Sequence, residues 1–514
     1  MDITLTILNI CIITIAICLS VVSSLHIFQL NSYQIKSHLN RIKENPAQLL
    51  PNTIIFALSL LSFVFDNNIS YIYIDVLFII AIYINRPKKA KKPFVYTPRV
   101  KRQLATISAL YIVVLICGLI LNNPVFAACL FFFLIPLIII ISAIINKPIE
   151  KSISNGFIND AKKILQSMES MKIIGVTGSY GKTSVKYYLN TLLKAQYNVL
   201  MTPGSFNTPM GVVRTIREYL KPTHEIFVCE MGARHVGDIK EICDIVHPHD
   251  GIITSIGPQH LETFYTLNNI KKTKFELADA CEKHGRLFVN LDDENIVSCL
   301  DGKKYIGYGL NNKSGYYAKD IKISEKGTEF TLVTPSGEEC IFSTRLIGSH
   351  NVLNIVGAIA VANTYGIPLE KLRPQVRKLE CVPHRLEMKD HGNVVIIDDA
   401  YNANPSGTKA ALDVFSVFDG YKILITPGMV ELGEKQDEYN YEFGINAANV
   451  CDFVILVGHK QTESIYKGLI NANFDKEKIY ITDKVEDGIN FAYSIDTKGI
   501  KKYILLENDL PDNY

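Results

Sequence analysis

Long apolar segments dominate the first 146 residues of the 514-residue chain. Four of them carry no charge or a single acid, at residues 3–28, 45–65, 69–84 and 103–146. The first is long enough to cross a hydrocarbon core of about 30 Å as a helix. The single acid, Asp75, lies in the third. The turn Asn122-Asn123-Pro124 divides the last segment, because proline suits a turn or the start of a helix. The pattern predicts a membrane domain at 1–146 with about five transmembrane helices.

The pattern changes after this domain. Residues 147–170 place apolar side chains at helical spacing, which predicts an amphipathic connector helix. Short β-rich runs then alternate with helical stretches, as is typical of parallel α/β sheets. Two such domains are predicted, at 171–383 and 384–514. Residues 304–345 consist of short strand-like runs, which predict an inserted antiparallel sheet.

The charge distribution separates the membrane part from the rest. The net charge of +2 combines +7 in residues 1–146 with −5 in the remainder. A nucleic-acid-binding protein would cluster its positive charge on a folded domain, but here the excess lies between hydrophobic runs. We therefore expect a membrane as partner and no nucleic acid. Eleven cysteines without a C-x-x-C pair argue against a disulfide scaffold or zinc ribbon and predict a reducing compartment.

Basic residues of the first domain lie in two loops. They are Lys36, Arg41 and Lys43 in the first, and Arg86, Lys88, Lys89, Lys91, Lys92, Arg99, Lys101 and Arg102 in the second. The positive-inside rule places both loops and everything after Lys147 in the cytoplasm, so we expect a multi-pass cell-membrane protein. The second loop is either only a topology signal or a contact for anionic headgroups or a pyrophosphate-linked lipid. Asp75 either marks a polar pathway or lies near an interface.

The sequence G-V-T-G-S-Y-G-K-T-S at residues 175–184 follows a β run and opens a helix. Its glycines let the backbone wrap a phosphate, Lys182 supplies positive charge to the β- and γ-phosphates of a nucleotide, and the Thr183 hydroxyl can bind Mg²⁺. The predicted fold class is therefore an α-helical transmembrane block, a P-loop parallel-sheet ATPase domain, and a C-terminal Rossmann-like α/β domain.

The spacing of this loop resembles T-G-x-x-G-K-T, the variant of the ATP-dependent Mur ligases. Other motifs that resemble this family are S-F-N-T-P-M-G-V (205–212), E-M-G-A (230–233), H-L-E-x-F (260–264), K-x-K-x-E-L (272–277), G-S-H-N-V-L-N (348–354), V-P-H-R-L-E (382–387), D-D-A-Y-N-A-N-P (398–405) and M-V-E-L-G (429–433). The last two resemble most the branch that adds D-alanyl-D-alanine to a muramoyl tripeptide.

The resemblance implies roles for individual residues. Catalytic roles fall to Lys182, Lys274 and Arg385, and nucleotide-binding roles to Gly178, Ser179, Gly181, Lys182, Thr183, Ser184, His350, Asn351, Asn354, Arg385 and Asp399. Metal-binding roles fall to Thr183, Glu230, His260 and Lys274, and substrate-binding roles to Asn207, Thr208, Asn402 and Asn404. Glu230 also ends a hydrophobic strand at the edge where open α/β sheets bind ligands.

The resemblance also implies the cofactors. They are ATP and Mg²⁺, with two ions expected, and carbamylation of Lys274 that would turn a cation into a metal-binding carboxylate. His350, Asn351 and Asn354 resemble adenine contacts, and an Asn amide both donates and accepts as an adenine edge requires. Arg385 resembles the contact to the γ-phosphate and Asp399 the contact to the ribose.

Both ends of the chain depart from the family pattern. A membrane block replaces the usual domain for uridine diphosphate, and the K-G-S-R strand end is replaced by residues 505–514. We therefore expect an ATP-dependent amide ligase that joins a cell-wall precursor carboxylate, a nucleotide- or lipid-linked muramoyl peptide, to an amino acid or dipeptide amine through an acyl phosphate. Two alternatives are a ligase of the folylpolyglutamate or polyglutamate type and a non-catalytic, ATP-responsive membrane scaffold.

Overall fold

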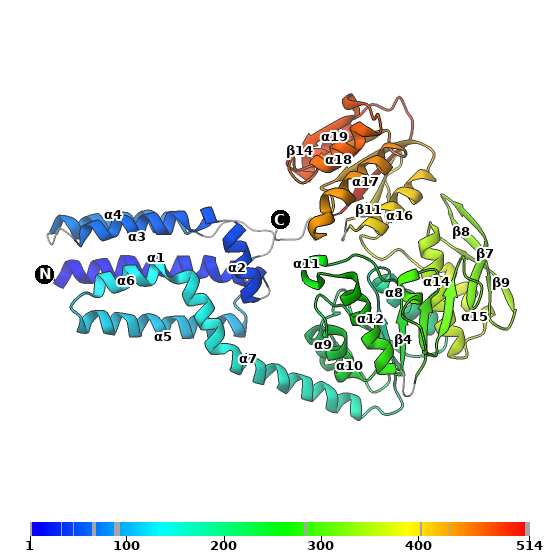
Figure 1. Ribbon diagram of the computed structural model, residues 1–514, viewed down its shortest axis with the longest axis horizontal. Helices are drawn as coiled ribbons and strands as arrows, with labels where there is room; N and C mark the ends of the chain where they lie inside the picture. Colours follow the sequence, from blue (N-terminus) through cyan, green and yellow to red (C-terminus); the bar gives the residue numbers. More distant parts are fainter. Residues whose placement is uncertain are drawn as a thin grey trace. The chain divides into compact units, whose positions relative to one another are not determined.

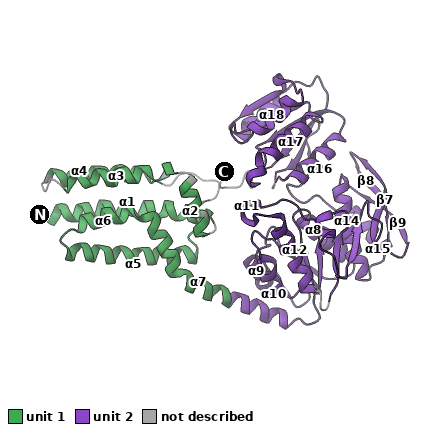
Figure 2. Ribbon diagram, in the orientation of Figure 1, with its two compact units in different colours: residues 1–156, 511–514 green, residues 157–510 purple. Residues whose placement is uncertain are grey.

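The computed structural model describes residues 3–31, 33–44, 46–63, 68–86, 93–281, 285–400, 403–430 and 432–508. The chain divides into two compact units, drawn in different colours in Figure 2. Unit 1 holds residues 1–156 and unit 2 holds residues 157–510. The predicted division into four consecutive parts remains a prediction.

Unit 1 consists of helices that pack around an apolar core (Figure 1). They are α1 (Ile3–Leu30), α2 (Ile35–Glu44), α3 (Leu50–Ser62), α4 (Asn68–Ile84), α5 (Pro98–Ile120), α6 (Pro124–Phe133) and α7 (Ile135–Gln166). The predicted break at Asn122-Asn123-Pro124 is confirmed, since α5 ends before it and Pro124 opens α6. One polar pair is buried in this core, where Asn9 Nδ2 donates to Asp75 Oδ1 at 2.6 Å.

Length and composition single out two helices of unit 1, α1 and α5, as able to cross a membrane. A third candidate is the pair formed by α6 and α7, which is bent by 79°. Helices α3 and α4 have 13 and 17 residues, which correspond to about 20 and 26 Å at 1.5 Å per residue. Helix α3 is shorter than the predicted span at 45–65, whereas α4 matches the predicted span at 69–84 to within one residue. The crossing of both helices remains a prediction.

The connector differs from its prediction. Helix α7 continues without interruption from Ile135 to Gln166, with Pro148 inside it, so residues 147–170 do not form a separate helix. A proline inside a helix removes one hydrogen bond and costs about 3 kcal/mol. The hydrogen bonds on both sides and the packing of Ala161 in a core of unit 2 offset this cost.

The first sheet of unit 2 is built mainly from parallel strands. They are β1 (Lys172–Thr177), β2 (Val199–Met201), β3 (Ile226–Glu230), β4 (Asp250–Ile253), β5 (Leu287–Asn290), β6 (Ile306–Gly309), β7 (Tyr316–Ser324), β8 (Gly327–Val333) and β9 (Glu339–Thr344). Their order is β2-β3-β1-β4-β5-β6-β7-β8-β9, and only the pairs β7–β8 and β8–β9 are antiparallel. The predicted antiparallel strands are confirmed in β7–β9. They do not form a separate inserted sheet, because β6 pairs with β5 and β7 pairs with β6 in the same sheet.

Helices cover both faces of this sheet. Successive residues of β1 point to opposite faces, so Ile174 joins one core and Ile173 the other. The first core contains α8 (Lys182–Leu193), α14 (Ser349–Thr364) and α15 (Leu369–Arg377). The second contains α9 (Pro209–Tyr219), α10 (Asp238–Val246), α12 (Leu267–Cys281) and the end of α7.

The second sheet of unit 2 has six strands in the order β10-β11-β15-β12-β13-β14. They are β10 (Glu387–Asp390), β11 (Val394–Asp399), β12 (Tyr421–Thr426), β13 (Phe453–Val457), β14 (Ile479–Thr482) and β15 (Lys502–Glu507). All pairs are parallel except β10–β11. Helices α16 (Pro405–Ser416), α17 (Gln436–Ala448) and α18 (Glu463–Asn471) pack on one face and α19 (Val485–Ser494) on the other. The predicted α/β fold of both domains is confirmed.

Candidate active site

The loop between β1 and α8 requires two glycines. Gly181 has a left-handed backbone with φ 79°, and a Cβ on it would lie 2.7 Å from Asn354 Oδ1. A Cβ on Gly178 would collide with the Thr254 hydroxyl. Only glycine fits both positions. The loop therefore passes directly into α8, whose first N–H groups lack helical partners and can bind a phosphate.

Hydrogen bonds hold this loop from behind. The buried Ser179 hydroxyl bonds Gly257 O at 3.0 Å, and the Ser179 N–H donates to Ser255 O at 2.7 Å. The Tyr180 N–H donates to Ser255 Oγ at 2.8 Å. The side chain and the N–H of Ser179 thus stabilise the loop, and a nucleotide contact from this residue remains a prediction. Ser184 lies one residue past Thr183, in the first turn of α8.

Lys182 lies over the loop. Its Nζ donates to Gly178 O at 2.7 Å and to Ser179 O at 2.9 Å. Burial lowers the pKa of Lys182 to about 8; the charge of Glu230 opposes this shift and that of Arg385 adds to it. Three charged residues therefore act on one another electrostatically. They are the P-loop Lys182, Glu230 at the end of β3, and Arg385 after the first sheet.

Glu230 is the centre of a second cluster. Its Oε1 accepts hydrogen bonds from Thr183 Oγ1 and Asn207 Nδ2, both at 3.1 Å. Three residues that the sequence assigned to metal or substrate thus meet at one carboxylate. A hydroxyl and a carboxylate at the end of a P-loop are oxygen ligands of the kind Mg²⁺ prefers. These residues fit the predicted ion.

Lys186 completes this cluster and was missed by the sequence analysis. Its Nζ lies 2.8 Å from Glu230 Oε2 and donates to Gly204 O at 2.6 Å, and the two charged side chains are 0% and 2% exposed. Burial opposes ionisation of Glu230, but the charges of Lys186 and Lys182 outweigh it and hold the pKa of Glu230 below its usual value. Lys186 lies one turn after Lys182 on α8, so helical spacing was the available signal.

The other two predicted metal ligands lie on neighbouring elements. Lys274 is 2% exposed on α12, and burial together with the charge of Lys182 lowers its pKa well below the usual value. His260 is half-buried and immediately precedes α11 (Leu261–Phe264), with a left-handed φ of 52°. Their roles as ligands remain predictions.

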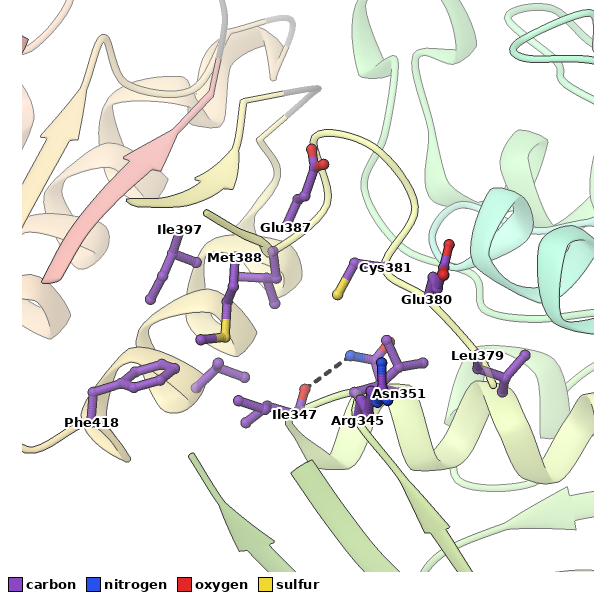
Figure 3. Close-up of a pocket in the computed structure, with 13 residues that line it drawn as sticks. Arg345, Ile347, Asn351, Leu379, Glu380, Cys381, Glu387, Met388, Ile397 and Phe418 are labelled. Carbon is purple, nitrogen blue, oxygen red and sulfur yellow. Dashed lines mark hydrogen bonds between the residues drawn. The ribbon is translucent and has the colours of Figure 1, made fainter. Parts of the chain in front are cut away.

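Helix α14 connects the loop with a cavity. Asn354 lies against Gly181, whereas Asn351 lies one turn earlier and lines a cavity of about 380 Å³. Asn351 accepts from Tyr188 OH at 2.8 Å and donates to Ile347 O at 2.9 Å, the bond dashed in Figure 3. Each amide atom can make one further hydrogen bond. Burial lowers the pKa of His350 to about 4, so its imidazole is neutral.

The cavity has walls from both α/β domains. In Figure 3, Met388, Ile397 and Phe418 line one side of it, opposite Asn351 and Leu379. Most of the side chains that line the cavity are apolar, Asn351 contributes an amide, and Arg345, Glu380 and Glu387 are its charged members. Such a lining suits a flat heteroaromatic group with a polar edge.

The C-terminal sheet contributes two acids at the same register. Asp399 and Glu507 are partners at the ends of β11 and β15. Asp399 Oδ1 accepts from the Leu386 N–H at 3.1 Å, and the charge of Arg385 acts on Asp399. Burial and the neighbouring Asp399 raise the pKa of Glu507 well above its usual value. Glu507 was also missed, although it lies in the segment that departs from the family pattern.

Two predicted substrate residues have structural hydrogen bonds. Thr208 caps α9 by accepting from the Gly211 N–H at 3.3 Å, and Asn404 caps α16 by accepting from the Gly407 N–H at 2.8 Å. Asn402 lies outside the described residues. In the described residues, capping a helix accounts for each of the two side chains. A substrate role for these residues remains a prediction.

These features define a nucleotide-dependent enzyme of two catalytic domains. They are a P-loop on a parallel sheet, an adjacent acid, and a second α/β domain whose first residues act on the P-loop lysine. Residues 176–362 match the model of the Mur ligase middle domain, and residues 384–505 match that of the Mur ligase, glutamate ligase domain. The chain is 32% identical over 329 residues to UDP-N-acetylmuramoyl-tripeptide--D-alanyl-D-alanine ligase of Bacillus subtilis, covering 63% of this chain and 70% of that one. It belongs to the Mur ligase family, whose members are ATP-dependent ligases.

Other relatives agree with this assignment. The enzyme of the same name from Escherichia coli is 32% identical over 300 residues, which cover 57% of this chain and 66% of that one. The MurF structure from Acinetobacter baumannii superposes with a TM-score of 0.64 at 25% identity, over 70% of this chain and 78% of that one. MurF from Thermotoga maritima, solved with ADP, gives 0.62 at 26% identity, over 69% and 80%.

The buried ion pair gives a testable prediction. Replacing Lys186 by Met leaves Glu230 buried without its cation, which costs about 3–5 kcal/mol. We expect Lys186→Met to lower the thermal midpoint of the full-length protein in detergent. The matched control is Lys194→Met, because Lys194 is exposed at the end of the same helix. Adding Glu230→Gln to Lys186→Met should restore part of the loss; an unchanged midpoint for the single variant would contradict the prediction.

Proposed function

We propose that the chain joins the carboxylate of a muramoyl peptide to the amine of an amino acid or dipeptide, at the cytoplasmic face of the cell membrane. The observation that carries the chemistry is the convergence of Thr183, Asn207 and Lys186 on Glu230 beside the P-loop. The relatives' names supply the substrate class, a UDP-N-acetylmuramoyl tripeptide and D-alanyl-D-alanine.

The reaction needs an activated acyl group, because a free carboxylate and an amine form a salt at neutral pH. A carboxylate oxygen attacks the γ-phosphorus of ATP, ADP leaves, and an acyl phosphate forms. The amine nitrogen then attacks the acyl carbon, loses a proton and expels phosphate. Lys182 and Arg385 stabilise the charge that develops on the transferred phosphoryl group. Mg²⁺ held by Thr183 and Glu230, with His260 and a carbamylated Lys274 for a second ion, supplies further charge neutralisation when bound.

The adenine is proposed to occupy the cavity beside Asn351. Helix α14 carries Asn354 against the P-loop and Asn351 against the cavity, one turn apart. Phosphates at the loop and a base in the cavity are therefore compatible with one extended nucleotide. Asp399 follows Arg385 in the other domain and is proposed to hold the ribose.

The membrane assignment rests on unit 1. The family models begin at residue 176, so unit 1 lies outside them. Its helices expose large apolar side chains, such as Ile112, Val113 and Ile116, which are each at least half exposed. We propose that unit 1 spans the membrane and that the precursor is nucleotide-linked or lipid-linked. Lys88, Lys89, Lys91 and Lys92, which the sequence offered for lipid contact, lie outside the described residues.

Ligase activity is tested by phosphate release from full-length protein in detergent. ATP is supplied with UDP-linked muramoyl tripeptide and D-alanyl-D-alanine, together or singly. We expect phosphate release only when the tripeptide and the dipeptide are both present. Lys182→Ala should lower the rate of release on the order of 10³-fold, since this charge acts in the transition state. Lys172→Ala is the matched control, because Lys172 is exposed at the start of β1. Near-normal turnover by Lys182→Ala would refute the assignment of the loop.

Carbamylation of Lys274 has its own test. The lowered pKa leaves a neutral amine whose nitrogen can attack the carbon of CO₂, with loss of one proton, to give a carbamate. An ammonium group beside Mg²⁺ would be repelled, so the charge must be reversed for metal binding. Lys274→Ala should lose activity and regain part of it with acetate or formate, whereas Lys272→Ala, exposed on the same helix, should not change. Full activity of Lys274→Ala without added acid would rule the carbamate out.

Topology is tested by cysteine labelling in a variant without native cysteines. The five-span arrangement places Lys36→Cys inside and Ile69→Cys outside, because α3 would cross between them. We expect Lys36→Cys to react only in inside-out vesicles and Ile69→Cys only in right-side-out vesicles. Reaction of both positions from the cytoplasmic side would show that α3 does not cross the membrane.

A further inference from the structure

Unpartnered polar atoms gather at one end of unit 1. Within the described residues, eight buried side-chain nitrogen or oxygen atoms have no hydrogen-bond partner, and one of these, Glu230 Oε2, is in the ion pair with Lys186. Five of them belong to this end, namely Asn31 Nδ2, His38 Nδ1, Arg41 Nη1, Arg99 Nε and Gln103 Oε1. Buried polar groups in folded proteins are almost always hydrogen-bonded, so a concentration of exceptions points to a ligand.

Described contacts bring these residues together. The Phe28 ring packs on the rings of Tyr33 and His38, with centroids 5.6 and 5.1 Å away. The Arg99 guanidinium lies 4.1 Å from the centroid of Tyr33. This chain of contacts joins the end of α1, helix α2 and the first turn of α5, which Figure 1 shows at the same end of unit 1.

Helical spacing then aligns the polar atoms. His38 and Arg41 lie three residues apart on α2, and Arg99 and Gln103 lie four residues apart on α5. Residues at these spacings share one face of a helix. Asn31 follows the end of α1 and is 8% exposed. Two helix faces and one loop residue thus form a single group.

This group carries a positive charge. Glu150 bonds Arg102 through two contacts of 2.7 and 3.0 Å, and its other contact is a longer one of 3.9 Å to Arg99 Nε. One carboxylate is therefore shared by two guanidinium groups, and Arg41 adds a further charge. Burial and the charge of Arg41 lower the pKa of His38, so its ring is neutral. The N–H groups of Asn31 and Arg41 that lack a hydrogen bond are donors suited to phosphate oxygens, and so is Arg99 Nε, whose ion-pair contact with Glu150 is 3.9 Å long.

The position favours a lipid over a soluble anion. Helix α2 places Leu39, 40% exposed, beside the basic residues, and the outer surface of α5 is apolar. The donors lie where apolar helices end and polar segments begin, which is the level of lipid headgroups in a membrane. A soluble phosphate would gain nothing from the adjoining apolar surface.

We propose that Asn31, Arg41 and Arg99 form a binding site for the phosphate group of a lipid in the cytoplasmic leaflet, a phosphate monoester or a diphosphate. The proposal rests on the membrane placement of unit 1, and it provides the lipid-linked form of the precursor with a specific contact.

The test uses full-length protein in nanodiscs of neutral lipid doped with phosphatidic acid, a polyprenyl diphosphate or, as the uncharged reference, diacylglycerol. Bound lipid is counted by native mass spectrometry after release. We expect both phosphate lipids to be enriched over diacylglycerol, and at least tenfold less enrichment for Asn31→Asp and for Arg41→Gln. Asn31→Asp has nearly the same shape and replaces a donor by a repelling carboxylate. The matched control is Arg86→Gln, because Arg86 is exposed, lies 5.0 Å from the centroid of the Tyr83 ring and is not one of the five residues of the group.

Three results would overturn the proposal. An equal loss of lipid enrichment in Arg86→Gln would mean that binding is general charge attraction. Enrichment of diacylglycerol equal to that of the phosphate lipids would mean that the phosphate is not recognised. Competition by inorganic pyrophosphate at the affinity of the lipid would mean that the ligand is soluble. Carbonate extraction of membranes is measured in parallel, and so is phosphate release from the soluble precursor. Extraction of the protein without detergent would refute the membrane placement itself, whereas active, membrane-bound protein without lipid selectivity would refute only this site.

Discussion

The contact between Lys186 and Glu230 is the constraint on which the active site depends. Two opposite charges are almost completely removed from water, a state that is costly unless each charge finds a partner at short distance. The lysine belongs to the helix that follows the P-loop, and the glutamate ends the neighbouring strand β3. Pairing them fixes the helix against the sheet, and the Thr183 and Asn207 side chains then meet at the remaining carboxylate oxygen. A hydrophobic pair could hold the helix equally well, but it would leave no ionised carboxylate beside the phosphate loop.

The parts of this arrangement that follow from local sequence could be predicted, and those that depend on distant pairing could not. The P-loop, the strand before Glu230 and the order of the two α/β domains each have a signal within about ten residues. Lys186 lies on a helix, and its partner is 44 positions away on a strand. A lysine in the middle of a helix is usually exposed to solvent. Strands β7 to β9 have an antiparallel pattern, yet only the pairing of β6 with β5 shows that they continue the main sheet. Asn351, which the motif assigns to the nucleotide, also bonds Tyr188, a contact between two helices that no motif contains.

Unit 1 shows where sequence patterns mislead. Hydropathy located the apolar helices, because the apolar or polar character of each residue can be taken directly from the sequence. It did not give the bend between α6 and α7 or the passage of α7 through Pro148, since both depend on which packing the neighbours offer. The same holds for the polar residues at the ends of its helices. A count of basic side chains indicates the orientation of the helices in a membrane. Only the contacts distinguish an arginine that is neutralised, such as Arg102, from one whose Nη1 has no hydrogen bond, such as Arg41.

The register that places Asp399 opposite Glu507 has a consequence for proton balance. Two carboxyl groups at the ends of adjacent buried strands cannot both be ionised at low cost, so burial and the neighbouring carboxyl make the pair hold a proton more tightly than either carboxyl would alone. Any cationic group that docks between them replaces that proton and releases it to the solvent. The heat of such a docking step would then include the ionisation heat of the buffer, and the affinity would rise with pH. In this domain the end of the sheet acts as a reservoir for a single proton, set by strand pairing and burial together.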